Sequence, residues 1–219
     1  LNLRFEYTFA KAIADISESE AQFAFCRSCE RGVTGFDVRH RAVVSALFDL
    51  PVGRGRKFGA TLPLLAESLI GGWTVTGIST FQTGVAIPVT ATNRTGAAFV
   101  DQRPNRLCDG RDDALSGNLR NNGFKHFATE CFQIPGAAFF GTTGRNILNA
   151  PGVNNFDFGI HKFFRFTEQV RFQFRAEMFN AFNHANFAAP NTLANSPNFG
   201  LVSASRAPRL IQLGGKITF

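Results

Sequence analysis

The sequence lacks any long apolar run. Charges, glycines or prolines interrupt every apolar stretch of its 219 residues, and none approaches the roughly 18 consecutive apolar residues that a membrane-spanning helix requires. This absence argues against a helical membrane protein. Trp, Tyr and Met are also scarce, with one residue of each, and only 18% of the residues are charged. The apolar bulk must therefore come from other residue types.

Phenylalanine supplies most of that bulk. The chain has 26 Phe, and 44% of its residues are hydrophobic. A soluble domain would have to bury these rings in a core, whereas a β-barrel can turn them toward lipid and place them in aromatic girdles at the two membrane surfaces. The composition therefore favours a chain that meets a membrane with strands rather than helices.

The net charge of +7 raises the question of a nucleic-acid partner. Chains that bind nucleic acid carry clustered basic patches or recognisable motifs. Here the basic residues are spread along the chain, and Arg54, Arg56 and Lys57 form the only tight group. In a barrel the same charges would line a polar lumen or meet acidic lipopolysaccharide, so we expect no nucleic-acid partner.

The first nine residues alternate apolar and polar side chains without a break, which predicts a β-strand. A signal peptide would show a basic segment, an apolar run and a small-residue cleavage site, and none of these precedes the strand. We therefore expect the chain to begin inside a longer protein, with the signal peptide and any upstream domain outside it.

A hairpin near the C-terminal end gives the strongest pattern. Residues 155–166 and 170–178 alternate apolar and polar side chains and are joined by the short turn 167–169. Strands of about ten residues with apolar side chains on one face and polar ones on the other match a transmembrane β-hairpin. A soluble hairpin can alternate too, but it rarely sets repeated charged or amide side chains opposite large apolar ones. The polar side of the second strand carries Arg171, Gln173, Arg175 and Glu177.

Six segments in all have strand character, and together they predict an all-β protein. They are residues 1–9, 41–50, 73–88, 155–166, 170–178 and 210–219. Residues 51–56 are dense in turn formers, and residues 62–70 can hold a brief helical turn. The stretches 14–40 and 90–151 are long and have no sustained periodicity, and a loop with Pro190, Pro197 and Gly200 leads to the last strand. Because outer-membrane barrels have short periplasmic turns and long outer loops, we expect an antiparallel transmembrane β-barrel segment with long extracellular loops.

About six strands are too few for a closed barrel, because the smallest known barrels have roughly eight. Lipid forbids an open sheet edge, since each unpaired backbone group there costs several kcal/mol. We therefore expect further strands upstream and take these six as the C-terminal strands of a larger barrel. Ile217 and Phe219 would then form the terminal aromatic signal that the barrel-insertion machinery reads.

Several separated motifs occur in a fixed order along the chain. They are Arg39-His40-Arg41, Gly71-Gly72-Trp73, residues 144–148, residues 151–157 and residues 172–184. In these motifs the chain resembles the C-terminal barrel region of Oar-like TonB-dependent transporters of the type abundant in Acidobacteria. The resemblance implies that residues 1–219 are the C-terminal portion of a barrel of about 22 strands with an internal plug, and that the plug domain lies outside this chain. It also implies TonB-driven uptake of a bulky substrate, such as a siderophore, an oligosaccharide or a peptide.

The four cysteines fall into two sets, Cys26 with Cys29 and Cys108 with Cys131. A CxxC can be a redox motif, but the βαβ pattern that accompanies such a motif is missing. It can also be half of a zinc site, but there is no second CxxC and no His pair to complete the site. All four lie in predicted outer loops, where an oxidising export route favours disulfides. We therefore predict bridges between Cys108 and Cys131 and between Cys26 and Cys29.

No other residues form a recognisable reactive set. The four histidines show no HxxxH or HExxH spacing, and nothing brings a base to a nucleophile, so we expect no metal, no cofactor and no enzymatic activity. The polar faces of the strands supply the candidates for contact with substrate or plug, or for a hydrogen-bonded charge ladder. These lumen-facing candidates are Arg41, Arg171, Arg175 and Glu177.

Two other functions fit parts of the sequence. The chain could be a small outer-membrane barrel with a structural or adhesive role, or a soluble all-β binding module. The expected partners of a barrel are outer-membrane lipid and lipopolysaccharide, the barrel-insertion machinery and, through missing N-terminal parts, the TonB system. We expect the protein in the outer membrane of a Gram-negative bacterium.

Overall fold

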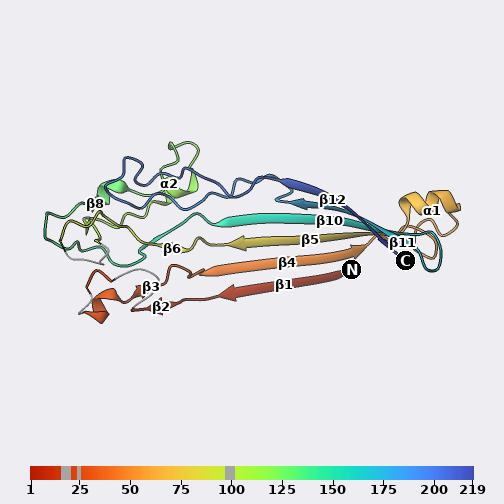
Figure 1. Ribbon diagram of the computed structural model, residues 1–219, viewed down its shortest axis with the longest axis horizontal. Helices are drawn as coiled ribbons and strands as arrows, with labels where there is room; N and C mark the ends of the chain where they lie inside the picture. Colours follow the sequence, from red (N-terminus) through yellow and green to blue (C-terminus); the bar gives the residue numbers. More distant parts are fainter. Residues whose placement is uncertain (16–20, 24–25, 97–101) are drawn as a thin grey trace.

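The dominant element of the fold is one antiparallel sheet of six strands (Figure 1). The computed structural model describes residues 1–15, 21–23, 26–96 and 102–219, so residues 16–20, 24–25 and 97–101 of the predicted loops lie outside it. In sheet order the strands are β1 (Asn2–Phe9), β4 (His40–Asp49), β5 (Trp73–Gln82), β10 (Val153–Arg165), β11 (Arg171–Phe179) and β12 (Leu210–Thr218). The predicted all-β class and the six strands are confirmed.

The register of the five pairings separates the sheet into two chemically different faces. One row of partners crosses every strand and contains Leu3, Ala46, Gly77, Phe158, Met178 and Ile211. The neighbouring row contains Asn2, Leu47, Thr76, Gly159, Glu177 and Gln212. Since side chains alternate along a strand, the first row belongs to an apolar face and the second to a polar face that extends over the whole sheet.

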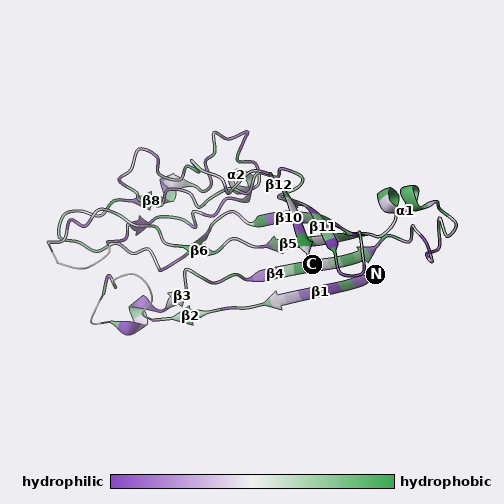
Figure 2. Cartoon of the chain, turned by 45° about the vertical axis from the view of Figure 1, so that its right-hand side comes forward, coloured by the Kyte–Doolittle hydropathy of each residue, from purple (hydrophilic) through white to green (hydrophobic). Residues whose placement is uncertain are grey.

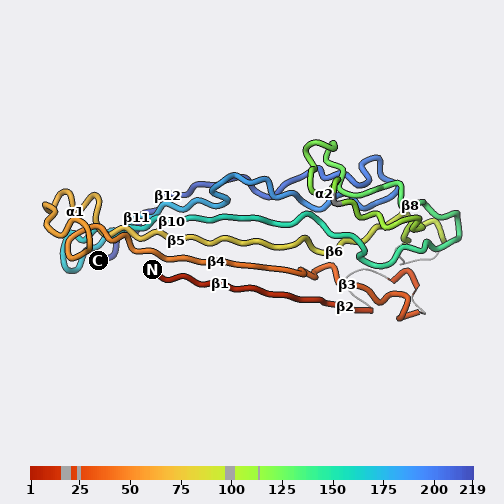
Figure 3. The backbone as a smooth tube through the Cα atoms, turned by 180° about the vertical axis from the view of Figure 1, so that it is seen from behind, coloured from red at the N-terminus to blue at the C-terminus, as the bar shows by residue number. Residues whose placement is uncertain are grey.

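The two ends of the sheet differ in their connections (Figure 1). One end has the tight turn of residues 166–170, the chain termini, and the connection that contains α1 (Leu64–Ile70). The predicted helical turn within residues 62–70 is confirmed. Within the described part of the chain, no helix is long and apolar enough to cross a bilayer. The other end gathers the long loops, which lie together far from α1 in the view from behind (Figure 3).

The long loops are folded, which their lack of periodicity did not reveal. Their short elements are β2 (Ile13–Ala14), η1 (Arg27–Glu30), β3 (Gly32–Val33), β6 (Ala86–Ile87), β7 (Asn105–Arg106), α2 (Asp113–Gly117), η2 (Thr129–Cys131), β8 (Phe132–Gln133) and β9 (Leu148–Asn149). A small core packs Val89, Phe127, Phe132 and Leu148 together. We call this set of packed loops the outer-loop assembly.

The third predicted strand, residues 73–88, is too long. β5 ends at Gln82, and the backbone of Thr83 makes one more bond, to the His40 carbonyl at 3.0 Å. Gly84 then lies so close to the backbone of Ala150 that any side chain would collide with it. The chain leaves the sheet at this contact, and residues 86–87 pair with β9 as the separate strand β6.

Two strand ends also differ from the prediction. β12 ends at Thr218, which pairs with Arg171, and Phe219 follows it 96% exposed. The strand therefore stops one residue before the terminus that was expected to belong to it. In the tight turn, the Val170 carbonyl accepts from Phe166 at 3.0 Å, so Val170 closes the turn and does not begin β11.

An arginine should be tolerated on one face of β12 and not on the other. Leu213 lies on the apolar face and Gln212 on the polar face. If the apolar face meets lipid, Leu213→Arg should destabilise the intact outer-membrane protein by about 2–4 kcal/mol, whereas Gln212→Arg should have little effect. The free energy of unfolding of both variants is measured by urea titration, with the folded fraction detected by its heat-dependent gel mobility. Equal shifts for the two would contradict the assignment of the faces.

Candidate functional site

The polar face of the sheet carries the charged residues of its six strands, except Lys162 of β10, which lies on the apolar face. Those on the polar face are Arg4, Glu6, Arg41, Asp49, Asp157, Arg165, Arg171, Arg175, Glu177 and Lys216, with His161 among them. The four residues predicted to face the lumen, Arg41, Arg171, Arg175 and Glu177, all lie on this face. Basic side chains outnumber acidic ones here, so the face favours anionic groups.

Several of these side chains are held by polar neighbours on the same face. Arg4 forms an ion pair with Glu6 at 3.0 Å. The Thr74 hydroxyl donates to Asp49 at 2.6 Å, and Thr76 lies 3.2 Å from Nε2 of His161. These bonds hold the side chains in defined positions on the polar face.

Arg175 has open space beside it. Its guanidinium donates to Gln173 at 2.9 Å, and its register partner on β12 is Gly214, which has no side chain. Arg175 and Gly214 line a hollow of about 270 Å³ on the polar face, together with Glu177, Gln212 and Lys216. The hollow brings two of the predicted lumen-facing residues, Arg175 and Glu177, together, and it has room for a polar group of a ligand.

A larger cavity of about 480 Å³ lies in the outer-loop assembly. Its lining includes Arg111, Asp112, Ser116, His126, Asn149 and His184. His126 is only 6% exposed, and its Nε2 donates to the Asn149 carbonyl at 2.7 Å. Its Nδ1 is then an acceptor, and within the described residues no hydrogen-bond donor reaches it. Burial lowers the pKa of His126, an effect that the bond to Asn149 partly offsets.

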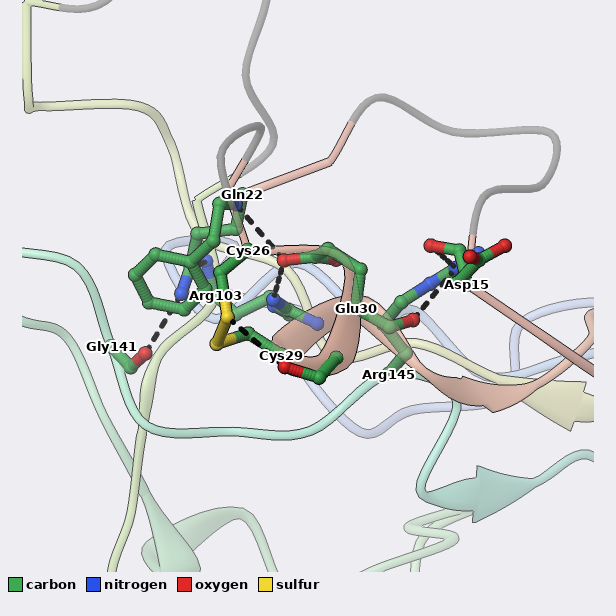
Figure 4. Close-up of polar contacts among 10 residues, drawn as sticks. Asp15, Gln22, Cys26, Cys29, Glu30, Arg103, Gly141 and Arg145 are labelled. Atoms are coloured by element: carbon green, nitrogen blue, oxygen red, sulfur yellow. Dashed lines mark hydrogen bonds and ion pairs between the residues drawn. A yellow bond between two sulfur atoms is a disulfide. The ribbon is translucent and has the colours of Figure 1, made fainter.

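A buried ion pair joins the first outer loop to the second (Figure 4). Arg103 donates to Glu30 at 2.6 Å, and their side chains are 5% and 3% exposed. Gln22 lies beside them and accepts from the Arg103 backbone at 2.6 Å while donating to the Gly141 carbonyl at 2.8 Å. Arg145 adds a bond to the Glu30 carbonyl at 3.0 Å. Sequence reasoning missed this cluster because Glu30 and Arg103 are 73 residues apart.

The structure contains both predicted disulfides. The Cys26–Cys29 bridge closes the turn around η1, directly before Glu30 of the buried ion pair. The Cys108–Cys131 bridge spans 23 residues and places Cys131 in the small core of the outer-loop assembly. Both bridges therefore stabilise the outer-loop assembly and not the sheet.

The remaining sequence candidates lie apart from these sites. Ile217 is on the apolar face, paired with Phe172, and Phe219 is at the exposed chain end. Among the described residues, no three His, Cys, Asp or Glu side chains are grouped closely enough to hold a metal ion. The polar face and the cavity in the outer-loop assembly are therefore two candidate sites in the described part of the chain.

Comparison with known protein families adds one finding. A family model described as an outer membrane beta barrel domain matches residues 1–212. No curated protein and no solved structure gives a significant match. The matched span contains β1, β4, β5, β10 and β11 completely, together with the first residues of β12.

Removing the disulfides should loosen the outer loops without opening the sheet. The double substitution Cys108→Ser with Cys131→Ser frees the longer segment and should cost the outer-loop assembly about 3 kcal/mol, whereas Cys26→Ser with Cys29→Ser should cost about 2. Limited proteolysis of intact outer membranes measures loop opening, and heat-dependent gel mobility measures the barrel. Faster loop cleavage after loss of the Cys26–Cys29 bridge than after loss of the Cys108–Cys131 bridge would contradict this order.

The outer-loop assembly should become less stable in mild acid because of His126. Its pKa lies below the ordinary value of 6.5, so the unfolded segment takes up a proton at a higher pH than the folded one. The stabilisation is complete above about pH 6.5 and is lost as the pH falls through the lower pKa of the folded state.

Proteolysis of the outer loops at about pH 7.5 and about pH 5.5 tests this dependence. The wild-type loops should be cleaved faster at the lower pH. His126→Gln can keep a donor for the Asn149 carbonyl but does not titrate, so its cleavage should depend much less on pH. The same pH dependence in the variant would show that another group is responsible.

Proposed function

The chain belongs to the outer membrane beta barrel domain family, and from this premise we propose that it forms part of a TonB-dependent transporter. In this proposal residues 1–219 are the C-terminal part of the barrel, and the full protein takes up a bulky substrate with energy supplied through TonB. The observation that carries the proposal is the continuous polar face, which leads to the outer-loop assembly with its cavity.

The charged residues of the polar face support a wide lumen. Arg171, Arg175 and Glu177 lie on the same face of β11 and need water or polar partners, because burial of unpaired charges is costly. A narrow barrel fills its interior with its own side chains, whereas large transporters enclose a plug domain. We assign these residues, with Arg41, to contacts with a plug or a passing substrate.

The six-stranded sheet supports a barrel larger than itself. Among the described strands, β1 and β12 each have a partner on one side only. Both free edges would expose backbone N–H and C=O groups to lipid, at several kcal/mol for each group. Since the smallest barrels need roughly eight strands, we propose that additional strands complete the wall between β1 and β12.

The proposed partners follow from this arrangement. Lipopolysaccharide would surround the outer-loop end, the insertion machinery would read the last strand with Ile217 and Phe219, and TonB would act through a domain outside this chain. We assign no cofactor and no catalytic step to these residues. A siderophore, an oligosaccharide and a peptide all remain substrate candidates.

Growth of a gene-deletion strain on a panel of these three substrate classes tests the function. We expect poor growth on one class, an equal defect in a strain without TonB, and recovery with the intact gene. Normal growth on every class, together with loss of surface attachment, would overturn transport in favour of an adhesive barrel.

Substitution on the polar face gives a sharper test. Arg171→Gln with Arg175→Gln should lower uptake of the identified substrate by roughly a hundredfold or more, because each arginine removes a charge-assisted hydrogen bond that contributes about 1.5–3 kcal/mol. Thr218→Gln, also on the polar face, is the matched control and should retain uptake. Equal uptake by both variants at equal barrel levels would remove the arginines from the transport path.

A further inference from the structure

The connection between β4 and β5, residues 50–72, carries a helix whose apolar side chains face outward. Leu64, Leu65 and Leu69 of α1 are strongly exposed, and Leu65 is 81% exposed. The apolar character of α1 stands out at the tip of the molecule (Figure 2). A surface helix of a soluble protein has the opposite arrangement, with leucines inward and charges outward. The exposed face of α1 therefore suits an apolar environment.

Hydrogen bonds within the connection fix this inverted orientation. The carboxylate of Glu67, the one charged residue of α1, accepts from the Arg54 backbone at 2.8 Å. It also lies against Gly53 and Gly71, where any side chain would collide with it. The Arg54 guanidinium donates to the Leu62 carbonyl at 3.0 Å. The Glu67 carboxylate therefore points into the connection, and the leucine side chains of α1 remain exposed on its surface.

The end of α1 is attached to the apolar face of the sheet. The Trp73 indole donates to the Leu69 carbonyl at 2.9 Å, and the Lys162 ammonium donates to the Gly71 carbonyl. Trp73 and Lys162 are register partners, and the ammonium lies 5.1 Å from the centroid of the Trp73 ring. Since both side chains belong to the apolar face, α1 lies on the outside of the barrel wall and not below the lumen.

The same connection has a basic surface. Arg54, Arg56 and Lys57 are exposed, and Glu67 is the only acidic residue within residues 50–72. The connection lies at the end with the tight turn of residues 166–170, which in an outer-membrane barrel is the periplasmic side (Figure 1). Phospholipid headgroups lie at this level, and basic residues bind anionic headgroups.

We propose that this connection is a lipid anchor in the periplasmic leaflet of the outer membrane. Leu64, Leu65 and Leu69 enter the boundary between headgroups and acyl chains, and Arg56 and Lys57 bind the phosphates of anionic phospholipids. A helix with one apolar face and basic neighbours lies in the plane of this interface. The anchor is continuous with the lipid-facing side of the barrel wall and does not depend on TonB-driven transport.

Spin labelling of the full-length protein in phospholipid vesicles tests the anchor. A nitroxide at Leu65→Cys is compared with one at Glu168→Cys, which lies in the polar turn at the same end of the sheet. Vesicles contain phosphatidylethanolamine and phosphatidylglycerol, and heat-dependent gel mobility verifies that each barrel is folded. We expect the label at residue 65 to collide mainly with oxygen, which concentrates in lipid, and the label at residue 168 mainly with a water-soluble nickel complex.

The charge requirement is measured with the same label. Arg56→Gln with Lys57→Gln should lower the ratio of lipid-immersed to water-exposed label roughly fivefold for each basic residue removed, and vesicles of phosphatidylcholine alone should give a similar loss.

Three results would contradict the proposal. A label at residue 65 as water-exposed as that at residue 168 would overturn the anchor. Shielding from both reagents would overturn it in favour of a protein partner or a second copy, and immersion that is independent of charge would overturn the headgroup contact.

Discussion

The hydrogen-bonded register between neighbouring strands is the constraint on which the other features depend. Side chains alternate along each strand, so a slip of one residue in any pairing would move its apolar side chains to the polar face. The five pairings avoid this, and rows such as Leu3 to Ile211 remain apolar from β1 to β12. In a bilayer this register also satisfies the backbone groups, which lipid cannot do.

The outer-loop assembly is stabilised by different forces, those of a soluble domain. Phe127 and Leu148 pack in a small core, and the Glu30–Arg103 pair replaces lost hydration with a close ion pair. The two disulfides are concentrated in this part of the chain, where the core is small. One chain thus uses strand pairing in the membrane and packing, charge and covalent links outside it.

Some residues depart from the regular strand pattern where the sheet meets the connections at its two ends. Lys162 is a charge on the apolar face, and it is accommodated because the Gly71 carbonyl and two aromatic rings surround its ammonium. Gly84 allows a backbone contact with Ala150 where β5 leaves the sheet. Lys162 pairs with Trp73, the first residue of β5, and Gly84 lies just beyond the last residue of β5, so both exceptions lie where this strand meets its connections.

The sequence by itself determined the strands, the two faces and the cysteine pairs. Alternation is a local property, so the hairpin of β10 and β11 and the polar positions of Arg171, Arg175 and Glu177 could be predicted from neighbouring residues. The end of β5, the Glu30–Arg103 pair and the His126 cavity could not, because they depend on contacts between distant segments. The outward face of α1 was decided only by the tertiary structure, since its sequence is compatible with either orientation and Glu67, Trp73 and Lys162 select one.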